Sequence, residues 1–197
     1  MNTKINLHVS LIFAFCFLSF STQVFSKEDE DPDSFAKTYA GVEIGRNFPT
    51  AGSEEQFAPG KAHPILAYRY VLDDKWLMGI FGGFKMLQTR GVEDQSEREI
   101  PFFSVTHESS RILRLYHPTY LATGFRFMYL MPATRAMIPT GKSKDFSTEF
   151  GASATATLIH LLDRNRILTL RIERWRGTGS STYQGIEVAV GGAISFD

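Results

Sequence analysis

The sequence has almost no cysteine, because its single cysteine, Cys16, lies in the apolar N-terminal segment. If that segment is removed on export, disulfides and thiolate metal sites are excluded. Net charge is also lacking: 21 basic residues balance 21 acidic ones, which excludes the basic excess of a nucleic-acid-binding protein. After residue 26 no run of 18 apolar residues occurs, so any membrane span there must consist of strands.

Residues 1–26 predict a cleaved secretory signal peptide. Lys4 supplies the positive charge and Ile5 to Phe20 the apolar core. A retained helical anchor is the alternative, but the apolar run is short for a spanning helix. Residues 27–37 are acidic and contain proline, which predicts a flexible leader. We expect one folded domain over residues 38–197.

A period-two alternation recurs from Tyr39 to Phe196. Long apolar residues fall on one parity, whereas charged residues and glycines share the other. This pattern is typical of strands with one apolar face. Eight strands are expected near residues 38–47, 63–72, 75–87, 102–116, 119–130, 147–161, 166–176 and 182–196.

The connections between these strands are of two kinds that alternate along the chain. Three are tight and consist of turn-forming residues: Asp73-Asp74, His117-Pro118 and residues 163–165. Most of the others are long and polar, as expected for the outside loops of an outer-membrane barrel. The sequence therefore predicts an all-β fold, an eight-stranded antiparallel up-and-down transmembrane β-barrel in a bacterial outer membrane. The longer connections are expected at about 48–62, 88–101, 131–146 and 177–181.

Alternation alone does not decide which face is inside, since a soluble lipocalin-like barrel alternates equally well. The glycines favour an inward charged face, because long charged side chains in a narrow interior need small neighbours. Such charges should neutralise one another in a structural network that plugs the barrel. The functional alternative is a gated ion path or a catalytic carboxylate. The expected lumen charge network consists of Glu43, Arg69, Lys85, Arg114, Arg126, Glu149, Arg171, Glu173 and Glu187.

Two strands depart from the simple pattern. Pro64 restricts the start of the second strand to a position near a loop. In the fourth, Phe102 and Phe103 interrupt the alternation, and we expect a bulge there. Tyr and Trp residues near strand ends predict interfacial girdles.

Other motifs give little support to a cofactor. Residues 136–143, AMIPTGKS, superficially match a phosphate-binding loop, but Pro139 removes a donor and no helix-forming stretch follows. The histidines are widely spaced and no pair has a metal-ligand interval. We expect neither a metal nor another cofactor.

The sequence His107-Glu108-Ser109-Ser110 carries the enzymatic alternative. A hydrolase would use Ser109 or Ser110 with His107 as the base. His107 and Ser109 can share a face of a strand, so the carboxylate would have to come from a neighbouring strand.

From Thr38 to Asp197 the chain resembles the small OmpA/OmpX-like eight-stranded outer-membrane barrels in its parity, loop asymmetry and charged interior. Such proteins commonly carry a terminal aromatic for the assembly machinery, whereas here Phe196 is penultimate. The chain is similar to the lipid A deacylases of the outer membrane only in size, barrel architecture and the His107–Ser109 pair. This similarity transfers no catalytic role.

The leading interpretation is a monomeric, non-enzymatic barrel that contacts outer-membrane lipid and binds no nucleic acid. Its polar segment 89–99 is the candidate for contact with a surface ligand. The alternatives are an outer-membrane lipid A-modifying acyl hydrolase and a soluble periplasmic lipocalin-like carrier.

Overall fold

The computed structural model describes residues 35–50, 57–89, 98–132, 148–177 and 183–196. Of residues 89, 98–100 and 132 it describes the backbone only. The expected signal peptide, most of the leader, the centre of the 89–99 segment and the motif at 136–143 lie outside these ranges. The signal peptide therefore stays a prediction.

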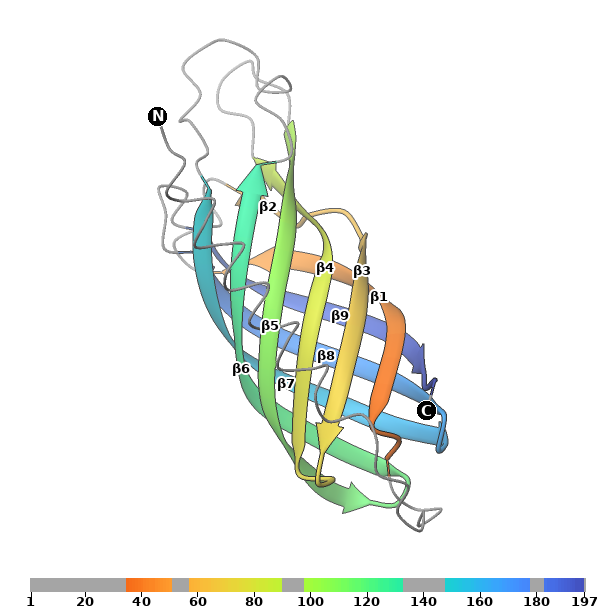
Figure 1. Ribbon diagram of the computed structural model, residues 1–197. Helices are drawn as coiled ribbons and strands as arrows, with labels where there is room; N and C mark the ends of the chain where they lie inside the picture. Colours follow the sequence, from red (N-terminus) through yellow and green to blue (C-terminus); the bar gives the residue numbers. More distant parts are fainter. Residues whose placement is uncertain (1–34, 51–56, 90–97, 133–147, 178–182, 197) are drawn as a thin grey trace, which may run out of the picture. The chain divides into compact units, whose positions relative to one another are not determined.

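Within the described ranges, eight long strands form a closed barrel (Figure 1). Each pairs antiparallel with the next long strand along the chain, and the first closes the ring by pairing with the last. The predicted eight-stranded antiparallel barrel is confirmed. The strands are β1 (Thr38–Pro49), β3 (His63–Leu72), β4 (Trp76–Thr89), β5 (Arg98–Tyr116), β6 (Thr119–Pro132), β7 (Glu149–Asp163), β8 (Arg166–Gly177) and β9 (Gln184–Ile194).

A ninth, two-residue strand was not predicted. This strand, β2 (Phe57–Ala58), pairs with Thr89 and Gln88 of β4. The β4–β5 hairpin also extends farther than expected, because its pairing continues to Thr89 and Arg98. The connection expected at 88–101 is therefore shorter than the sequence suggested.

The tight connections have the turn chemistry that the sequence predicted. Asp73 and Asp74 have positive φ angles of 51° and 49°, and the Lys75 amide donates to the Leu72 carbonyl at 3.1 Å. Two consecutive left-handed residues are the signature of the type I′ hairpin turn. At the β7–β8 turn, Asp163 Oδ1 accepts a hydrogen bond from the Asn165 amide at 2.9 Å. The tight turns lie at one end of the barrel, which is the end where β1 begins and β9 ends.

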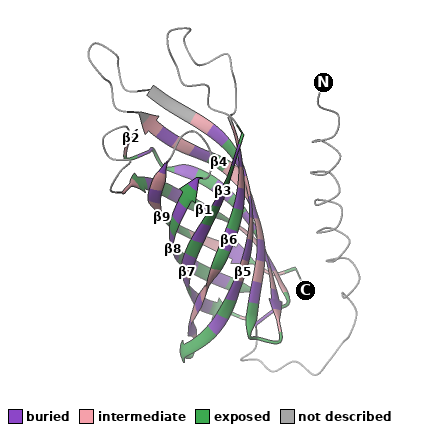
Figure 2. Cartoon of the chain, turned by 90° about the vertical axis from the view of Figure 1, so that its left-hand side faces the viewer, coloured by how far each residue is buried: buried purple, intermediate pink, exposed green. Residues whose placement is uncertain are grey.

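Burial follows the parity of the sequence, as the alternating colours along the strands in Figure 2 show. Leu66 and Phe125 on the outside are 66% and 67% exposed, whereas Arg171 on the inside is fully buried. Inward glycines give room to long side chains. A Cβ at Gly191 would lie 2.8 Å from Glu43 Cγ, which is too close for two carbon atoms. Apolar residues thus face outward and charged ones inward, which is the reverse of a lipocalin-like interior.

The bulge expected at Phe102 and Phe103 is wrong. Phe102 is 1% exposed and Phe103 is 38% exposed, so the alternation continues through both. Phe102 points into an aromatic cluster near the loop end of the barrel, which accommodates its ring inside the wall. The register shift of β5 lies instead between Arg114 and Tyr116, beside the tight turn.

Candidate functional site: a charged layer between two apolar clusters

The barrel interior is divided into three layers along its axis. We call the apolar cluster at the tight-turn end the floor and the apolar cluster at the loop end the roof. Charged side chains fill the space between them, around Phe81. The floor consists of Phe35, Ala36, Tyr39, Val71, Leu77, Ile112, Tyr120, Ala122, Ile159, Leu161, Ile167 and Ala193, and the roof of Phe57, Leu87, Phe102, Met128, Leu130, Trp175 and Tyr183.

The last residues of the expected flexible leader form part of the floor. The Phe35 ring lies 4.6 Å from the Tyr120 ring, and Ala36 is buried. The Ala36 amide donates to the Tyr39 hydroxyl at 2.9 Å, and that hydroxyl donates to the Arg164 carbonyl at 2.8 Å. Phe35 and Ala36, at the end of the segment expected to be flexible, are thus buried in the barrel mouth.

Aromatic rings pack closely in the roof. Tyr183 lies 4.6 Å from Trp175 and 5.0 Å from Phe57, measured between ring centroids. Burial raises the pKa of the Tyr183 phenol, and the negative charge of Glu187 raises it further. The phenol is therefore neutral, and the roof adds no charge to the layer beneath it.

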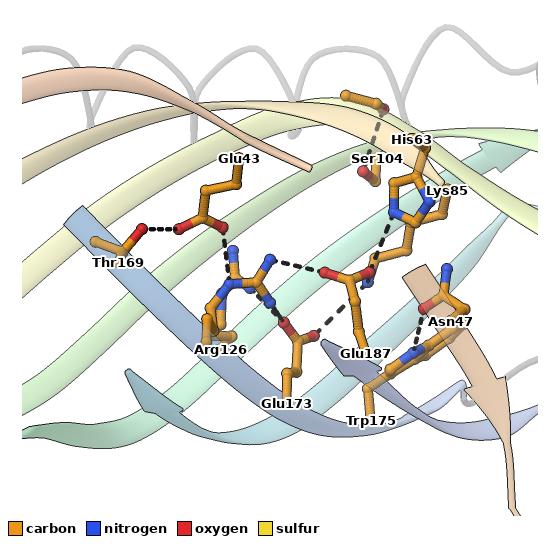
Figure 3. A network of polar contacts seen from close by, with 12 residues as sticks. Glu43, Asn47, His63, Lys85, Ser104, Arg126, Thr169, Glu173, Trp175 and Glu187 are labelled. Carbon is orange, nitrogen blue, oxygen red and sulfur yellow. Dashed lines mark hydrogen bonds and ion pairs between the residues drawn. The ribbon is translucent and has the colours of Figure 1, made fainter. Parts of the chain in front are cut away.

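Arg171 lies at the centre of the charged residues. Its Nε donates to Glu43 Oε2 at 2.9 Å and its Nη2 to Glu187 Oε1 at 2.7 Å, and its Nη1 pairs with Glu173. Figure 3 shows these three glutamates converging from different strands. One guanidinium thus holds three buried carboxylates, and its fork of donors suits this arrangement.

Three further cations complete the pairing. Arg69 pairs with Glu43, and Lys85 Nζ lies 2.6 Å from Glu187 Oε2 and 3.7 Å from Glu173 Oε1. Arg126 pairs with Glu173, and its Nε lies 3.6 Å from Glu108 Oε2. We call these eight residues the charged layer: Glu43, Arg69, Lys85, Glu108, Arg126, Arg171, Glu173 and Glu187.

The charged layer is formally neutral, with four cations and four carboxylates among the described residues. Buried ions are tolerated when each is paired and hydrogen-bonded. The Phe81 ring adds a cation–π contact, with Arg126 Cζ 3.9 Å and Arg69 Cζ 4.9 Å from its centroid. This arrangement can hold the wall together, but it offers no unbalanced charge to attract an ion.

Two of the nine expected lumen residues are not members of the charged layer. Arg114 has the inward parity but is exposed, because it lies at the tight-turn end beside the β5 register shift. Glu149 is buried at the start of β7, outside the pairs described above. The other seven are brought together.

Two contributors were missed from the sequence. Glu108 was considered only as a neighbour of serines, although its even position in β5 gives it the inward parity. His63 is buried with Nε2 3.4 Å from Glu187 Oε2, and its Nδ1 lies 3.2 Å from the Lys61 carbonyl oxygen. It begins β3 directly before Pro64, the residue expected to restrict the start of this strand to a position near a loop.

The wall separates Ser110, one of the two candidate serines of the hydrolase alternative, from His107. Ser110 points inward and donates to Glu108 Oε1 at 2.8 Å. His107 and Ser109 have the outward parity, so His107 and Ser110 lie on opposite faces. The strand neighbours of His107 are Ile80 and Phe127, and those of Ser109 are Met78 and Phe125. These neighbours supply no carboxylate to orient the histidine.

The described residues contain neither a membrane-spanning helix nor a cluster of metal ligands. No helix among them is long and apolar enough to cross a bilayer. They also contain no group of three or more His, Cys, Asp or Glu side chains arranged to hold a metal ion.

Neither a protein-family model nor a curated protein matches the sequence. Solved structures do match the fold. Neisserial surface protein A (NspA) aligns with 82% of this chain and 98% of its own, at 10% identity and a TM-score of 0.55. The outer membrane protein OprG from Pseudomonas aeruginosa aligns with 83% of this chain and 96% of its own, at 10% identity and a TM-score of 0.52. The chain therefore has the fold of the small eight-stranded outer-membrane β-barrels.

Proposed function

We propose that this chain is a bacterial outer-membrane protein without enzymatic activity, which acts as a structural wall element and contacts its surroundings through its loops. The observation that carries this proposal is the outer surface. Large aliphatic and aromatic side chains are exposed on all eight long strands, whereas the charged layer is buried. An apolar surface that extends around a whole barrel is far larger than the patches that soluble monomers expose. Acyl chains are the environment that this surface fits.

The interior supports a structural role over transport. The floor and the roof cover the charged layer from both ends, and the layer itself is neutral. Eight strands enclose an interior only wide enough to be filled by side chains. We propose a closed barrel that is exported by a cleaved signal peptide at residues 1–26 and works as a monomer.

The loop end is the proposed site of contact with a surface ligand. The polar segment 89–99 includes the end of β4, the start of β5 and the connection between them. Pairing of β4 with β5 continues to Thr89, whereas pairing of β4 with β3 stops at Gly83, so this hairpin extends beyond β3 at the loop end. Long loops on a rigid barrel are common positions for binding residues.

The hydrolase and the soluble carrier receive no specific support. The described neighbours of His107 and Ser109 lack a carboxylate, and the lumen is charged rather than apolar. We therefore do not propose either of them.

Tryptophan fluorescence provides a direct test of the proposed membrane insertion. Trp76 is 46% exposed on the outer wall, whereas Trp175 is 2% exposed in the roof. The mature chain would be refolded into phosphatidylcholine vesicles with acyl chains brominated near the headgroup. We expect quenching of the wild-type fluorescence and little quenching in Trp76→Phe, which retains only Trp175. Membrane fractionation of cells and heat-modifiable gel mobility should accompany this result; a mature chain that stays in solution without detergent would refute the proposal.

A further inference from the structure

Three arginines interrupt the apolar outer wall near the loop end. Arg174 and Arg176 belong to β8 and Arg46 to β1, and all three are exposed with the outward parity. The strand between them, β9, carries uncharged outward residues at the same level. We call these three residues the arginine patch.

The strand register places the patch on β8 and β1, the outer two of three adjacent strands. Arg174 pairs with Ile186 of β9, which pairs with Phe48 of β1. Arg46 pairs with Val188, one outward position nearer the tight-turn end. Successive outward positions on one strand are about 6.6 Å apart and strands are about 4.8 Å apart, so all three guanidiniums can reach one headgroup region.

On β8 the patch marks the end of the aliphatic wall. Below it on β8, the outward residues are Leu168, Leu170 and Ile172, which are all exposed and aliphatic. A charged residue at such an edge extends its head toward the polar region and leaves its stem on apolar surface. The patch thus lies where lipid headgroups would be if the barrel is inserted.

The barrel itself provides no described carboxylate for Arg174 or Arg176. The strand glutamates with described side chains, Glu43, Glu108, Glu149, Glu173 and Glu187, are all buried inside. The described aspartates, Asp73, Asp74 and Asp163, lie at tight turns, at the other end. The guanidinium groups of both arginines have no hydrogen bond or ion pair within the described part of the chain, so their charge is available to an external anion.

Arg46 is held in place differently. Its Nε donates to the Gly60 carbonyl at 3.0 Å, and its guanidinium carbon lies 5.4 Å from the Phe48 ring centroid. These contacts use one of its five N–H donors and fix the group at the level of the patch. The remaining donors can serve the same anion as Arg174.

We propose that the arginine patch binds the phosphate of anionic lipid headgroups in the leaflet at the loop end. This inference rests on the proposed membrane insertion and adds a lipid class to it. Phosphate oxygens match the planar fork of arginine donors. The neighbours of Arg174 and Arg176 on β7 are Ala154 and Ala152, whose small side chains leave both arginines accessible from the lipid side.

The test compares lipid retention by matched variants. The wild type, Arg174→Gln/Arg176→Gln and the control Arg111→Gln would be refolded into phosphatidylcholine nanodiscs doped with phosphatidic acid. Arg111 is an exposed outward arginine near the tight-turn end, where β5 pairs with Trp76. Native mass spectrometry after detergent extraction counts the lipids that stay bound.

We expect the wild type and Arg111→Gln to retain phosphatidic acid over phosphatidylcholine, and the double variant to lose this preference by on the order of tenfold. Arg174→Lys/Arg176→Lys should retain an intermediate preference, because it keeps the charge but loses the fork. Equal retention by the wild type and the double variant would overturn the inference, as would an equal loss in Arg111→Gln. Binding of inorganic phosphate without any retention of phosphatidic acid would also overturn it, since the patch would then select a free anion rather than a lipid.

Heat-modifiable gel mobility reports folding, and it therefore distinguishes a failure of lipid binding by the arginine patch from a failure of the proposed membrane insertion. A wild type that folds in the bilayer without selecting phosphatidic acid refutes the lipid site alone. A wild type that does not insert into the bilayer refutes both. If the double variant does not fold, Arg46→Gln in the same assay takes its place, with a smaller expected loss of preference.

Discussion

Arg171 is the residue on which the charged layer depends most. It contacts Glu43, Glu173 and Glu187, which come from β1, β8 and β9. No other cation of the layer touches three carboxylates among the pairs described. Removal of a single partner from a buried ion pair leaves an uncompensated charge, and this costs more than the pair itself contributes.

Arg171→Met should therefore destabilise the folded barrel by about 3–5 kcal/mol, although methionine preserves much of the side-chain volume. The measurement is urea unfolding in phospholipid vesicles, followed by fluorescence. Arg114→Gln is the matched control, because this arginine is exposed at the barrel mouth. A loss below about 0.5 kcal/mol is expected for the control, and a similar loss for Arg171→Met would contradict the role assigned to it.

At the scale of single residues, the sequence predicted the face of a side chain better than its depth or its partners. Parity correctly placed Arg171 and Glu187 inside, because strand side chains alternate regardless of tertiary detail. It also assigned Arg114 to the inside, but parity carries no information about distance from the barrel mouth. The pairing of His63 with Glu187 joins strands remote in sequence and therefore leaves no local signal.

The strands and turns were predicted to within a few residues because their signals are local. Alternation covers ten or more residues in each strand, and the tight turns contain residues with known turn preferences. The strand β2 was missed because two residues are too few to display a period. The length of the β4–β5 hairpin was underestimated because its upper part is polar, like a loop.

The Asp73-Asp74 turn permits a test of hairpin chemistry. Both residues have left-handed φ angles, which aspartate tolerates and β-branched residues do not. Asp74→Val should be less stable than Asp74→Gly by about 1–2 kcal/mol, since valine in this region clashes with its own backbone. Equilibrium unfolding of the two variants under identical conditions measures the difference. Equal stability would show that the turn changes conformation.

Strand β9 provides a test of the depth of the apolar wall. Val190 pairs with Ile44 and Leu170 in the aliphatic part of the wall, whereas Ile186 lies beside Arg174. Val190→Arg should cost about 2–4 kcal/mol and Ile186→Arg about 0–1 kcal/mol, because the cost of a lipid-facing cation falls toward the interface. Unfolding in vesicles measures both. The opposite order would place the bilayer at a different level.

For the whole molecule, the sequence predicted the class of fold but not the internal layers. The alternation and the loop asymmetry are enough to specify a barrel of eight strands. The floor and the roof depend on which side chains meet across the lumen, and that is set by strand tilt and register. Phe35 joins the floor although its surrounding sequence is typical of a flexible leader.

The layered interior predicts that the barrel conducts no ions. Folded barrels inserted into a planar bilayer should show no discrete channel conductance, because the floor, the charged layer and the roof fill the lumen in series. An open porin inserted under the same conditions serves as the positive control. A reproducible single-channel step from the pure folded protein would contradict the closed interior.

The origin of the eight members of the charged layer has a consequence for assembly. They come from seven of the eight long strands, and β7 contributes the hydroxyls of Ser153, Thr155 and Thr157 to the interior instead. A strand whose register shifts by two residues still has its apolar side chains facing lipid and its polar ones facing the lumen, so the hydrophobic effect does not disfavour the shifted register. The same slip moves an ionised group by about 6.6 Å, which is beyond the reach of its counter-ion. The charged layer therefore disfavours a shifted register in nearly every strand of the barrel, because a shifted strand would leave a buried charge without its partner.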